Sequence, residues 1–443
     1  MTNWRERQLT RREIVATTLA GIAAAGLPDW YANAANASVR AESDALPATY
    51  GANNQLNVAG IGMGGSKGGY RRGLDMTTWA SQKPGVKIVA VCDIDQKHLE
   101  EAASRFGPDC AKYHDFREVL KRKDIDAVVI GTPDHWHAIV ASAALRAGKH
   151  VYCEKPLTLT IDEGKQLVRV AHNSKKIFQV GSQQRSDAKF RMACELVRNG
   201  RVGKLQNVKA NLPTAPKGGP FMPEPVPADL DWKMWLGPAP EADYLFNRTH
   251  GNFRWWLDYS GGMMTDWGAH HNDIAQWGMG MDGSGPLSVE AVGQGGIIGT
   301  NCYDVFPDFS VTYKYPNEMT LTTSNKGENG VEFIGDAGSI FVSRGVIRAS
   351  NEKLLTDPLP ANAVKLYESN DHMDNFINGV RTNTPTICPA EVGHRSVTVC
   401  HLANISLRLG GRHLDWDAKR EEFTNSKEAN AMLKRQMRGG WRV

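Results

Sequence analysis

Short apolar runs alternate with stretches of helical periodicity in the first part of the chain. Runs that are rich in β-branched residues and end at glycine, proline or acidic residues are typical of buried strands in a parallel sheet. They lie at residues 56–61, 86–91, 125–130, 150–153 and 178–180. Because helical segments separate them, the order predicts an α/β domain with a doubly wound Rossmann sheet, which we place at residues 55–180.

Beyond residue 181 the pattern changes to two-residue alternation between turns. Such runs predict half-exposed strands of a large, mostly antiparallel sheet. They lie at 204–211, 287–293, 308–315, 318–324, 331–335 and 339–342, and helices are expected at 372–380 and 391–409. We therefore predict a second α/β domain over 181–443, whose last helices could return to the first domain. One face of its sheet is expected to make homodimer or homotetramer contacts.

A glycine-rich loop follows the first strand directly. Gly60, Gly62 and Gly65 fit G-x-G-x-x-G between a strand and an expected helix, which is the context that dinucleotide-binding loops require. Its glycines allow a tight turn, a close approach to a pyrophosphate and close helix packing. We expect the loop, including Met63 and Gly64, to bind the cofactor.

Asp93 ends the second strand, where an acidic residue binds the ribose hydroxyls of NAD. It lies further from the glycines than the usual ~20 residues, so the segment between them must be enlarged. Its charge would repel a 2′-phosphate, which favours NAD over NADP. The alternative is a solvated strand end.

Two more strand ends carry polar motifs. Thr132, Pro133 and His137 follow the third long strand, and Glu154 and Lys155 follow the fourth. Ligands of doubly wound sheets bind outside the carboxyl ends of the strands, so we expect all five residues near the cofactor. An ammonium group there could polarise a substrate oxygen. The alternative for Lys155 is a surface lysine before a proline turn.

The glycine loop, the T-P-x-x-x-H turn and the E-K-P motif together resemble the Gfo/Idh/MocA oxidoreductase family, from about residue 56 to at least 277. The resemblance implies a Rossmann domain followed by an α/β domain with a large sheet. It also implies that Lys155 contacts nicotinamide and substrate. Gln183 is a cofactor candidate and Arg185 a substrate candidate, with structural roles as the alternative for both.

A second group of chemical residues lies in 259–277. On a helix starting near residue 263, Asp266, His270 and Asp273 share one face, whereas His271 points about 100° away from His270. The segment resembles the family pattern G-G-x-x-x-D-x-G-x-H, which implies His270 as the base and Asp266 as its orienter or a ligand of substrate hydroxyls. A buried structural pair is the alternative. Adjacent histidines diverge, so we predict no metal site and interpret His271 as a supporting or substrate contact.

Aromatic residues gather in and after a proline-rich loop at 213–240. Tryptophan rings suit the C–H faces of sugars, although packing is the alternative for any single one. Trp255, and Tyr259 at the start of the second group, are our candidates for sugar contacts.

The first 37 residues have the pattern of an export signal. Arginines at 5, 7, 11 and 12 precede a modest apolar stretch at 14–27 and small residues that suit cleavage. Residues 10–15 resemble a twin-arginine signal, and 38–54 are expected to be a linker. The apolar stretch is too short to span a membrane. We therefore expect a periplasmic or otherwise exported protein; an ordinary disordered N-terminus is the alternative.

Charge and cysteine content indicate which partners and which covalent links the protein is expected to lack. The net charge of +4 over 443 residues contains no dense basic block, so neither nucleic acid nor a membrane surface is an expected partner. The seven cysteines are scattered, and we predict no disulfide framework. Because twin-arginine export carries folded proteins, NAD loaded beforehand is expected to be tightly bound and recycled in place.

These observations predict an NAD-dependent oxidoreductase that oxidises a secondary hydroxyl of a sugar, glycoside or polyol, and the resemblance makes the glycoside 3-hydroxyl plausible. One alternative is an NAD-requiring glycosidase that acts by transient oxidation and elimination. Residues 265–270 read TDWGAH where those enzymes have a tyrosine-centred version, which argues against direct transfer. The other alternative is a non-catalytic sugar-binding or interaction protein.

Overall fold

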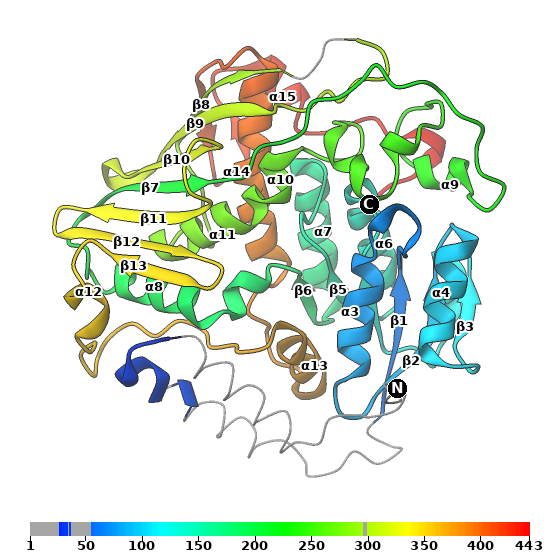
Figure 1. Cartoon of the computed structure of the whole chain (residues 1–443), viewed down its shortest axis with the longest axis horizontal. Helices are drawn as coiled ribbons and strands as arrows, with labels where there is room; N and C mark the ends of the chain where they lie inside the picture. Colours follow the sequence, from blue (N-terminus) through cyan, green and yellow to red (C-terminus); the bar gives the residue numbers. More distant parts are fainter. Residues whose placement is uncertain (1–25, 34, 37–54, 296–298) are drawn as a thin grey trace.

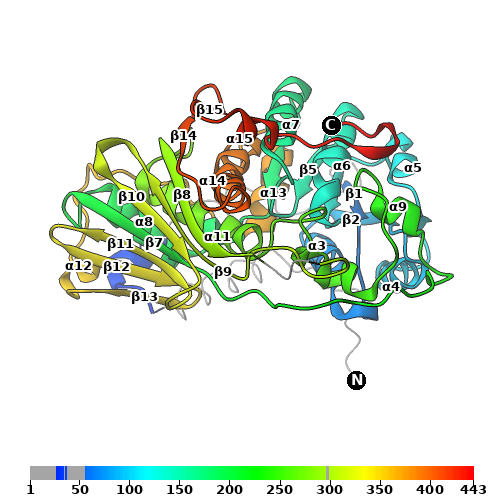
Figure 2. The same ribbon diagram turned by 90° about the horizontal axis from the view of Figure 1, so that it is seen from above.

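The computed structural model describes residues 26–33, 35–36, 55–295 and 299–443. Two sheets lie side by side (Figures 1 and 2). The first has six parallel strands in the doubly wound order β3-β2-β1-β4-β5-β6. The sequence predicts a doubly wound sheet and five of these strands, but not β3. Its strands are β1 (Leu56–Ile61), β2 (Val86–Cys92), β3 (Ala111–Tyr113), β4 (Ala127–Ile130), β5 (His150–Cys153) and β6 (Phe178–Val180).

Helices cover both faces of this sheet because alternate side chains of each strand are buried on opposite sides. One buried cluster joins Val58 of β1 to the helices on its side, and the other joins Ala59 to the opposite helices. The first side holds α3 (Arg72–Ser81), α4 (Gln96–Phe106) and α13 (His372–Thr382), and the second holds α5 (Phe116–Lys121), α6 (Asp134–Arg146) and α7 (Ile161–Ser174).

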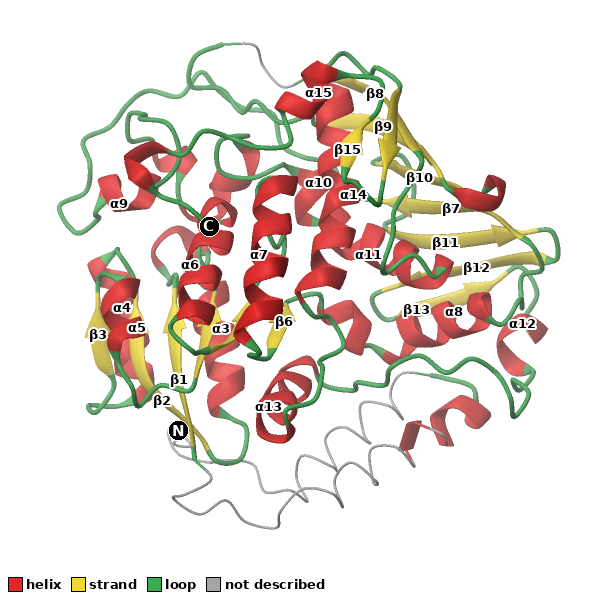
Figure 3. Ribbon diagram, turned by 180° about the vertical axis from the view of Figure 1, so that it is seen from behind, coloured by secondary structure: helices red, strands yellow, loops and turns green. Residues whose placement is uncertain are grey.

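The second sheet has nine strands in the order β13-β12-β11-β7-β10-β9-β8-β14-β15. Only the β7–β10 pair is parallel, which matches the expected mostly antiparallel sheet. The strands are β7 (Leu205–Asn211), β8 (Ser288–Gln294), β9 (Asp308–Lys314), β10 (Thr320–Ser324), β11 (Gly330–Gly335), β12 (Gly338–Ser343), β13 (Val346–Ala349), β14 (Leu414–Asp417) and β15 (Glu422–Phe423). Its helices, some of which pack on the sheet (Figure 3), are α8 (Ala188–Arg198), α10 (Met263–Asp266), α11 (Gly268–Met279), α12 (Lys353–Thr356) and α14 (Ala390–Arg408), with α9 (Trp232–Leu236) and α15 (Lys427–Ala431) beyond it.

The two domains share their core through C-terminal elements. Helix α13 packs on α3, and α14 packs on α7. At the edge of the first sheet, the Val180 amide donates to the Cys388 carbonyl over 2.9 Å. None of the helices in the described part of the chain combines the length and apolarity needed to cross a bilayer.

Most of the expected leader and linker lies outside the described residues. Within the described part, residues 29–33 are helical, and Tyr31 is buried against α8. Arg191 Nε donates to the Tyr31 hydroxyl over 2.8 Å, and Trp30 Nε1 donates to the Leu355 carbonyl over 3.1 Å. These contacts lie within the part of the chain that is expected to be an export signal.

The glycine loop is longer than the motif suggests. Helix α3 begins at Arg72, so Gly65 does not pack it against the strand. Gly73 does: a Cβ there would lie 2.0 Å from the Gly62 oxygen. Gly62 itself has a φ of 74°, and its Cβ would lie 2.6 Å from the Thr132 nitrogen, so this turn requires glycine. The insertion between Gly64 and Gly73 explains the long spacing from the loop to Asp93.

Candidate active site

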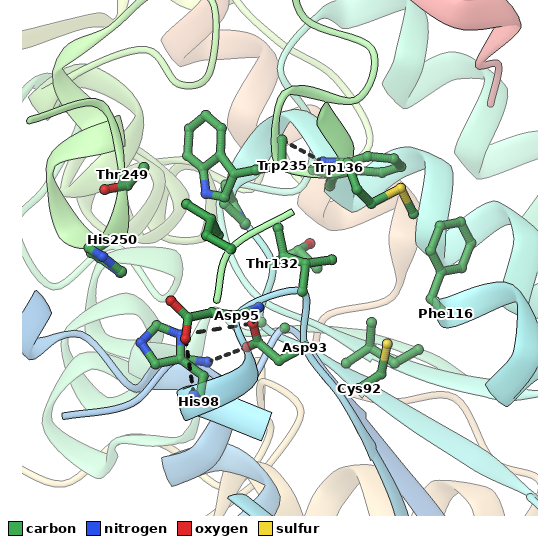
Figure 4. Close-up of a pocket in the computed structure, with 18 of the residues that line it drawn as sticks. Cys92, Asp93, Asp95, His98, Phe116, Thr132, Trp136, Trp235, Thr249 and His250 are labelled. Atoms are coloured by element: carbon green, nitrogen blue, oxygen red, sulfur yellow. Dashed lines mark hydrogen bonds and ion pairs between the residues drawn. The ribbon is translucent and has the colours of Figure 1, made fainter. Parts of the chain in front are cut away.

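A cavity lies at the carboxyl ends of β1, β2 and β4 (Figure 4). Gly62, Gly64, Asp93, Thr132 and Pro133 line it, so the structure brings five of the predicted cofactor residues together. The Thr132 hydroxyl is buried and has no hydrogen-bond partner among the described residues, and the glycine turn allows a ligand to approach the backbone. An extended dinucleotide would fit both features, because it supplies polar atoms along this edge of the sheet.

Asp93 is fixed by the loops around it. Its carboxylate accepts from the Gly64 amide and from the Asp95 amide, both over 2.9 Å. Burial raises the pKa of Asp93, and the nearby His98 opposes that shift. Each carboxylate oxygen has a further lone pair, so a ribose diol entering the cavity could still donate to this group.

The second domain closes the cavity with a segment that we call the strap, residues 227–256. It crosses from the sheet domain to the Rossmann domain (Figure 1). Its bridge to the Rossmann domain uses two backbone bonds, from Gln96 to the Asp229 oxygen (2.8 Å) and from Asp231 to the Ile94 oxygen (3.2 Å). The Asp229 carboxylate pairs with Lys67 (3.1 Å) and Lys97 (3.0 Å). The cavity wall on this side consists of Leu230, Met234, Trp235, Thr249, His250 and Phe253.

Lys155 and Asp266 meet between the domains. Lys155 Nζ lies 2.6 Å from Asp266 Oδ1 and 2.9 Å from its backbone oxygen, and Arg254 Nε lies 3.2 Å from the same Oδ1. Burial alone would raise the pKa of Asp266, but Lys155 and Arg254 outweigh it and hold the pKa well below its ordinary value. The Arg254 guanidinium stacks on Tyr70, which lines the cofactor cavity, so the two sites adjoin.

His270 stands beside this cluster as a neutral base. Its side chain makes no hydrogen bond within the described residues, and Nδ1 is buried, which leaves Nε2 to meet a ligand. Burial, followed by the charges of Lys155 and Arg344, lowers the pKa of His270 well below 6.5. The helix expected from residue 263 is two helices that meet at Trp267, and no hydrogen bond joins Asp266 to His270. Asp266 therefore orients Lys155 and Arg254 and does not orient the imidazole.

Three predicted substrate residues lie elsewhere. Arg185 is 1% exposed and pairs with Asp273 (2.8 Å) and Asp282 (2.7 Å), so it is a structural cation and not a substrate ligand. Tyr259 is buried in the core of the strap, with its ring 4.8 Å from that of Trp235. His271 is fully buried, and its Nε2 lies 2.8 Å from the Asn329 oxygen.

Trp255 is half-buried against the core of the strap, while Trp232, Trp235 and Trp256 form that core. The packing interpretation therefore holds for most of these rings, although Trp235 also faces the cofactor cavity.

Other predicted cofactor residues act as supports. Met63 lies in the core under α3, and Gly65 pairs with Tyr70 through the backbone. The two nitrogens of His137 lie 2.7 Å and 2.8 Å from the Pro156 and Thr132 oxygens, so this ring ties two strand ends together. Gln183 lines a separate hollow beside Tyr152.

Glu154 accepts from Arg72 Nε over 2.9 Å, which connects the E-K-P turn to α3.

Sequence reasoning missed Arg72, Arg254, Arg344 and Gly73, since no motif names them. In the described ranges, no three His, Cys, Asp or Glu side chains gather as metal ligands. All seven cysteines are buried and unpaired.

Comparison with known proteins shows that both domains of this chain match models of one family. Residues 56–182 match the Gfo/Idh/MocA model described as the NAD-binding Rossmann fold of an oxidoreductase family, and residues 218–443 match that family's C-terminal alpha/beta domain. Inositol 2-dehydrogenase of Salmonella typhimurium is 31% identical over 151 residues, which are 34% of this chain and 43% of that protein. A glycosyl hydrolase family 109 protein of Shewanella pealeana is 31% identical over 216 residues, 46% of each chain. The chain thus spans less than half the length of these curated relatives.

Among solved structures, the WlbA dehydrogenase from Bordetella pertussis, in complex with NADH and UDP-GlcNAcA, has a TM-score of 0.61. The likeness covers 82% of this chain and 99% of that one at 18% identity, and it shows the shared fold.

Proposed function

Because this chain belongs to the Gfo/Idh/MocA oxidoreductase family, we propose that it oxidises a secondary hydroxyl of a sugar, glycoside or polyol with tightly bound NAD. The observation that carries the proposal is the convergence of Lys155, Asp266 and a neutral His270 beside the cavity that Gly62, Asp93 and Thr132 line. The inositol dehydrogenase likeness supports a hydroxyl substrate.

The side chains divide the chemistry between them. His270 Nε2 accepts the hydroxyl proton, as an imidazole with a lowered pKa can do at neutral pH. Lys155 donates to the same substrate oxygen and stabilises the negative charge that grows there. Arg254 helps to keep Asp266 ionised, so that Asp266 holds Lys155 in place. When bound, NAD supplies the acceptor for the hydride that leaves the carbinol carbon.

The strap supports tight binding and Asp93 supports NAD over NADP. A ligand in the cavity has the Rossmann loops on one side and the strap on the other, so the bridge at Asp229 would slow its departure. A 2′-phosphate would lie beside the Asp93 carboxylate, and the repulsion between the two negative charges would weaken the binding of NADP.

The test is to purify the protein without added cofactor, release its ligand by denaturation and identify it. The native protein is then mixed with glycosides and polyols while the reduced-nicotinamide absorbance is followed. We expect about one NAD per chain and a band that grows with one class of substrate. The matched control is Lys155→Met, which should keep the NAD but lose the band. A protein that holds no dinucleotide contradicts the proposal.

A second candidate is an NAD-requiring glycosidase, which the likeness to a family 109 glycosyl hydrolase supports. Release of sugar from nitrophenyl glycosides without net NADH would favour it. A third candidate function is non-catalytic sugar binding. It would be favoured if both the wild type and Lys155→Met bind sugar equally well and neither turns it over.

We also propose export through the twin-arginine route to the periplasm and assembly as a homodimer or homotetramer. The Arg11–Arg12 pair supports the first. The broad second sheet supports assembly as a homodimer or homotetramer. Size-exclusion chromatography with multi-angle light scattering tests the oligomeric state directly.

A further inference from the structure

Arg344 lies beside the candidate active site, on a hairpin of the second sheet. It lies in the turn between β12 and β13, and its guanidinium carbon is 4.4 Å from the ring centroid of Trp267, the residue after Asp266. Stacking of this kind fixes a planar guanidinium and leaves its edge free to donate hydrogen bonds. The charge of Arg344 is also one of those that lower the pKa of His270, which places it near the base.

The other cations of the site have carboxylate partners, but Arg344 has none. Arg72 pairs with Glu154 over 2.9 Å, and Lys155 and Arg254 share Asp266. Within the described residues, no carboxylate lies at ion-pair distance from Arg344, whose side chain is exposed toward solvent.

Gln184 connects Arg344 to the catalytic helix. In the amide orientation that satisfies both ends, the Gln184 oxygen accepts from Arg344 Nε and its nitrogen donates to the His270 carbonyl, each over 3.3 Å. Partial burial and the neighbouring charge of Arg72 lower the pKa of Arg344, against the opposing effect of Asp266, Asp187 and Glu154. Among the cations of the site, Arg344 is therefore the one without a direct carboxylate partner in the described part of the chain.

We propose that the substrate is an acidic sugar, a hexuronic acid or its glycoside, whose carboxylate pairs with Arg344. This rests on the proposed function and names its substrate class. A carboxylate matches the fork of a guanidinium with two parallel hydrogen bonds. Its single negative charge matches the single charge of Arg344, whereas a phosphate dianion would exceed it. A neutral sugar would leave Arg344 unpaired.

The experiment compares methyl glucosides and galactosides with the corresponding methyl glucuronides and galacturonides, and with glucose 6-phosphate as the phosphate probe. Each is tested for NADH formation and for binding by calorimetry on the NAD-loaded enzyme. The variants are Arg344→Gln, Arg344→Lys and the control Arg348→Gln. Arg348 lies on the same hairpin, but it pairs with Glu328 and stacks on Phe341, away from the site.

We expect uronides to be preferred, and Arg344→Gln to weaken their binding and kcat/KM about tenfold to a hundredfold, as the loss of a hydrogen bond to a charged group does. Neutral sugars should lose less than uronides do, because for them only the effect of Arg344 on His270 changes, and Arg344→Lys should recover part of the uronide loss. Arg348→Gln should leave every substrate unchanged.

The outcomes separate the two proposals. Turnover of neutral sugars with no Arg344-dependent gain for uronides overturns the inference and leaves the proposed function standing. Binding of uronides that depends on Arg344, without turnover of any sugar, supports the acidic ligand and overturns the proposed function. Preference for glucose 6-phosphate, or binding of no sugar at all, overturns the inference.

Discussion

At the residue scale, we propose His270 as the base because burial and neighbouring cations favour its neutral form. Activity should therefore be lost as the pH falls through a pKa below 6.5. Lys155 has the largest effect on His270 among the neighbouring charges, so its removal should raise the pKa of His270. We expect Lys155→Ala to move the acidic limb of the kcat/KM profile to higher pH while also lowering the rate.

The control for this prediction is Lys155→Arg, which keeps the positive charge. Its acidic limb should stay where it is in the wild type even if the rate falls. A limb that stays in place in Lys155→Ala, or moves to lower pH, would show that Lys155 does not act on the base electrostatically.

Arg185 gives a second prediction at this scale, for stability. Breaking a buried ion pair by removing one partner typically costs about 3–5 kcal/mol. Arg185→Leu leaves Asp273 buried and unpaired, so we expect its free energy of unfolding in urea to fall by that amount. Arg412→Leu, which breaks the exposed pair with Glu428, should cost at most about 1 kcal/mol. Equal losses in both variants would contradict the buried-pair explanation.

At the scale of elements, we propose that the strap slows the release of the cofactor. Asp229 holds it through two partly exposed ion pairs, each worth up to about 1 kcal/mol. Asp229→Ala should therefore release NAD several-fold to about tenfold faster, and high salt should do the same to the wild type. The measurement is the decay of bound NAD after gel filtration.

Glu224→Ala is the matched control, because Glu224 is an exposed acid on the same loop and has no ion pair among the described residues. It should retain NAD as the wild type does. If the two variants release NAD at the same rate, the bridge at Asp229 does not hold the cavity closed.

At the scale of the whole molecule, we propose that the N-terminal arginines direct the folded protein to the periplasm. Arg11→Lys with Arg12→Lys should leave the protein in the cytoplasm of a host that has the twin-arginine route, since that signal depends on the pair. Cell fractionation measures this. Arg5→Lys with Arg7→Lys keeps the same charge and should still be exported; retention of both doubles, or export of both, would contradict the proposal.

The sequence by itself determined the order of the two domains, the six-stranded sheet except its short strand β3, and the grouping of Gly62, Asp93 and Thr132 around one cavity. This was possible because parallel strands bring their carboxyl ends to one edge, so residues that follow successive strands meet there. The same rule places Lys155 at that edge, where it contacts Asp266 of the other domain.

Only the tertiary structure decided which distant segments face each other. Residues 229–231 of the strap pair with 94–96, Asp282 completes the Arg185 pair, and Arg344 stacks on Trp267. These contacts depend on how the domains dock and on where the loops return, and no local periodicity encodes that. The same reason explains why Arg185, a reasonable substrate ligand beside a strand end, is a buried structural cation.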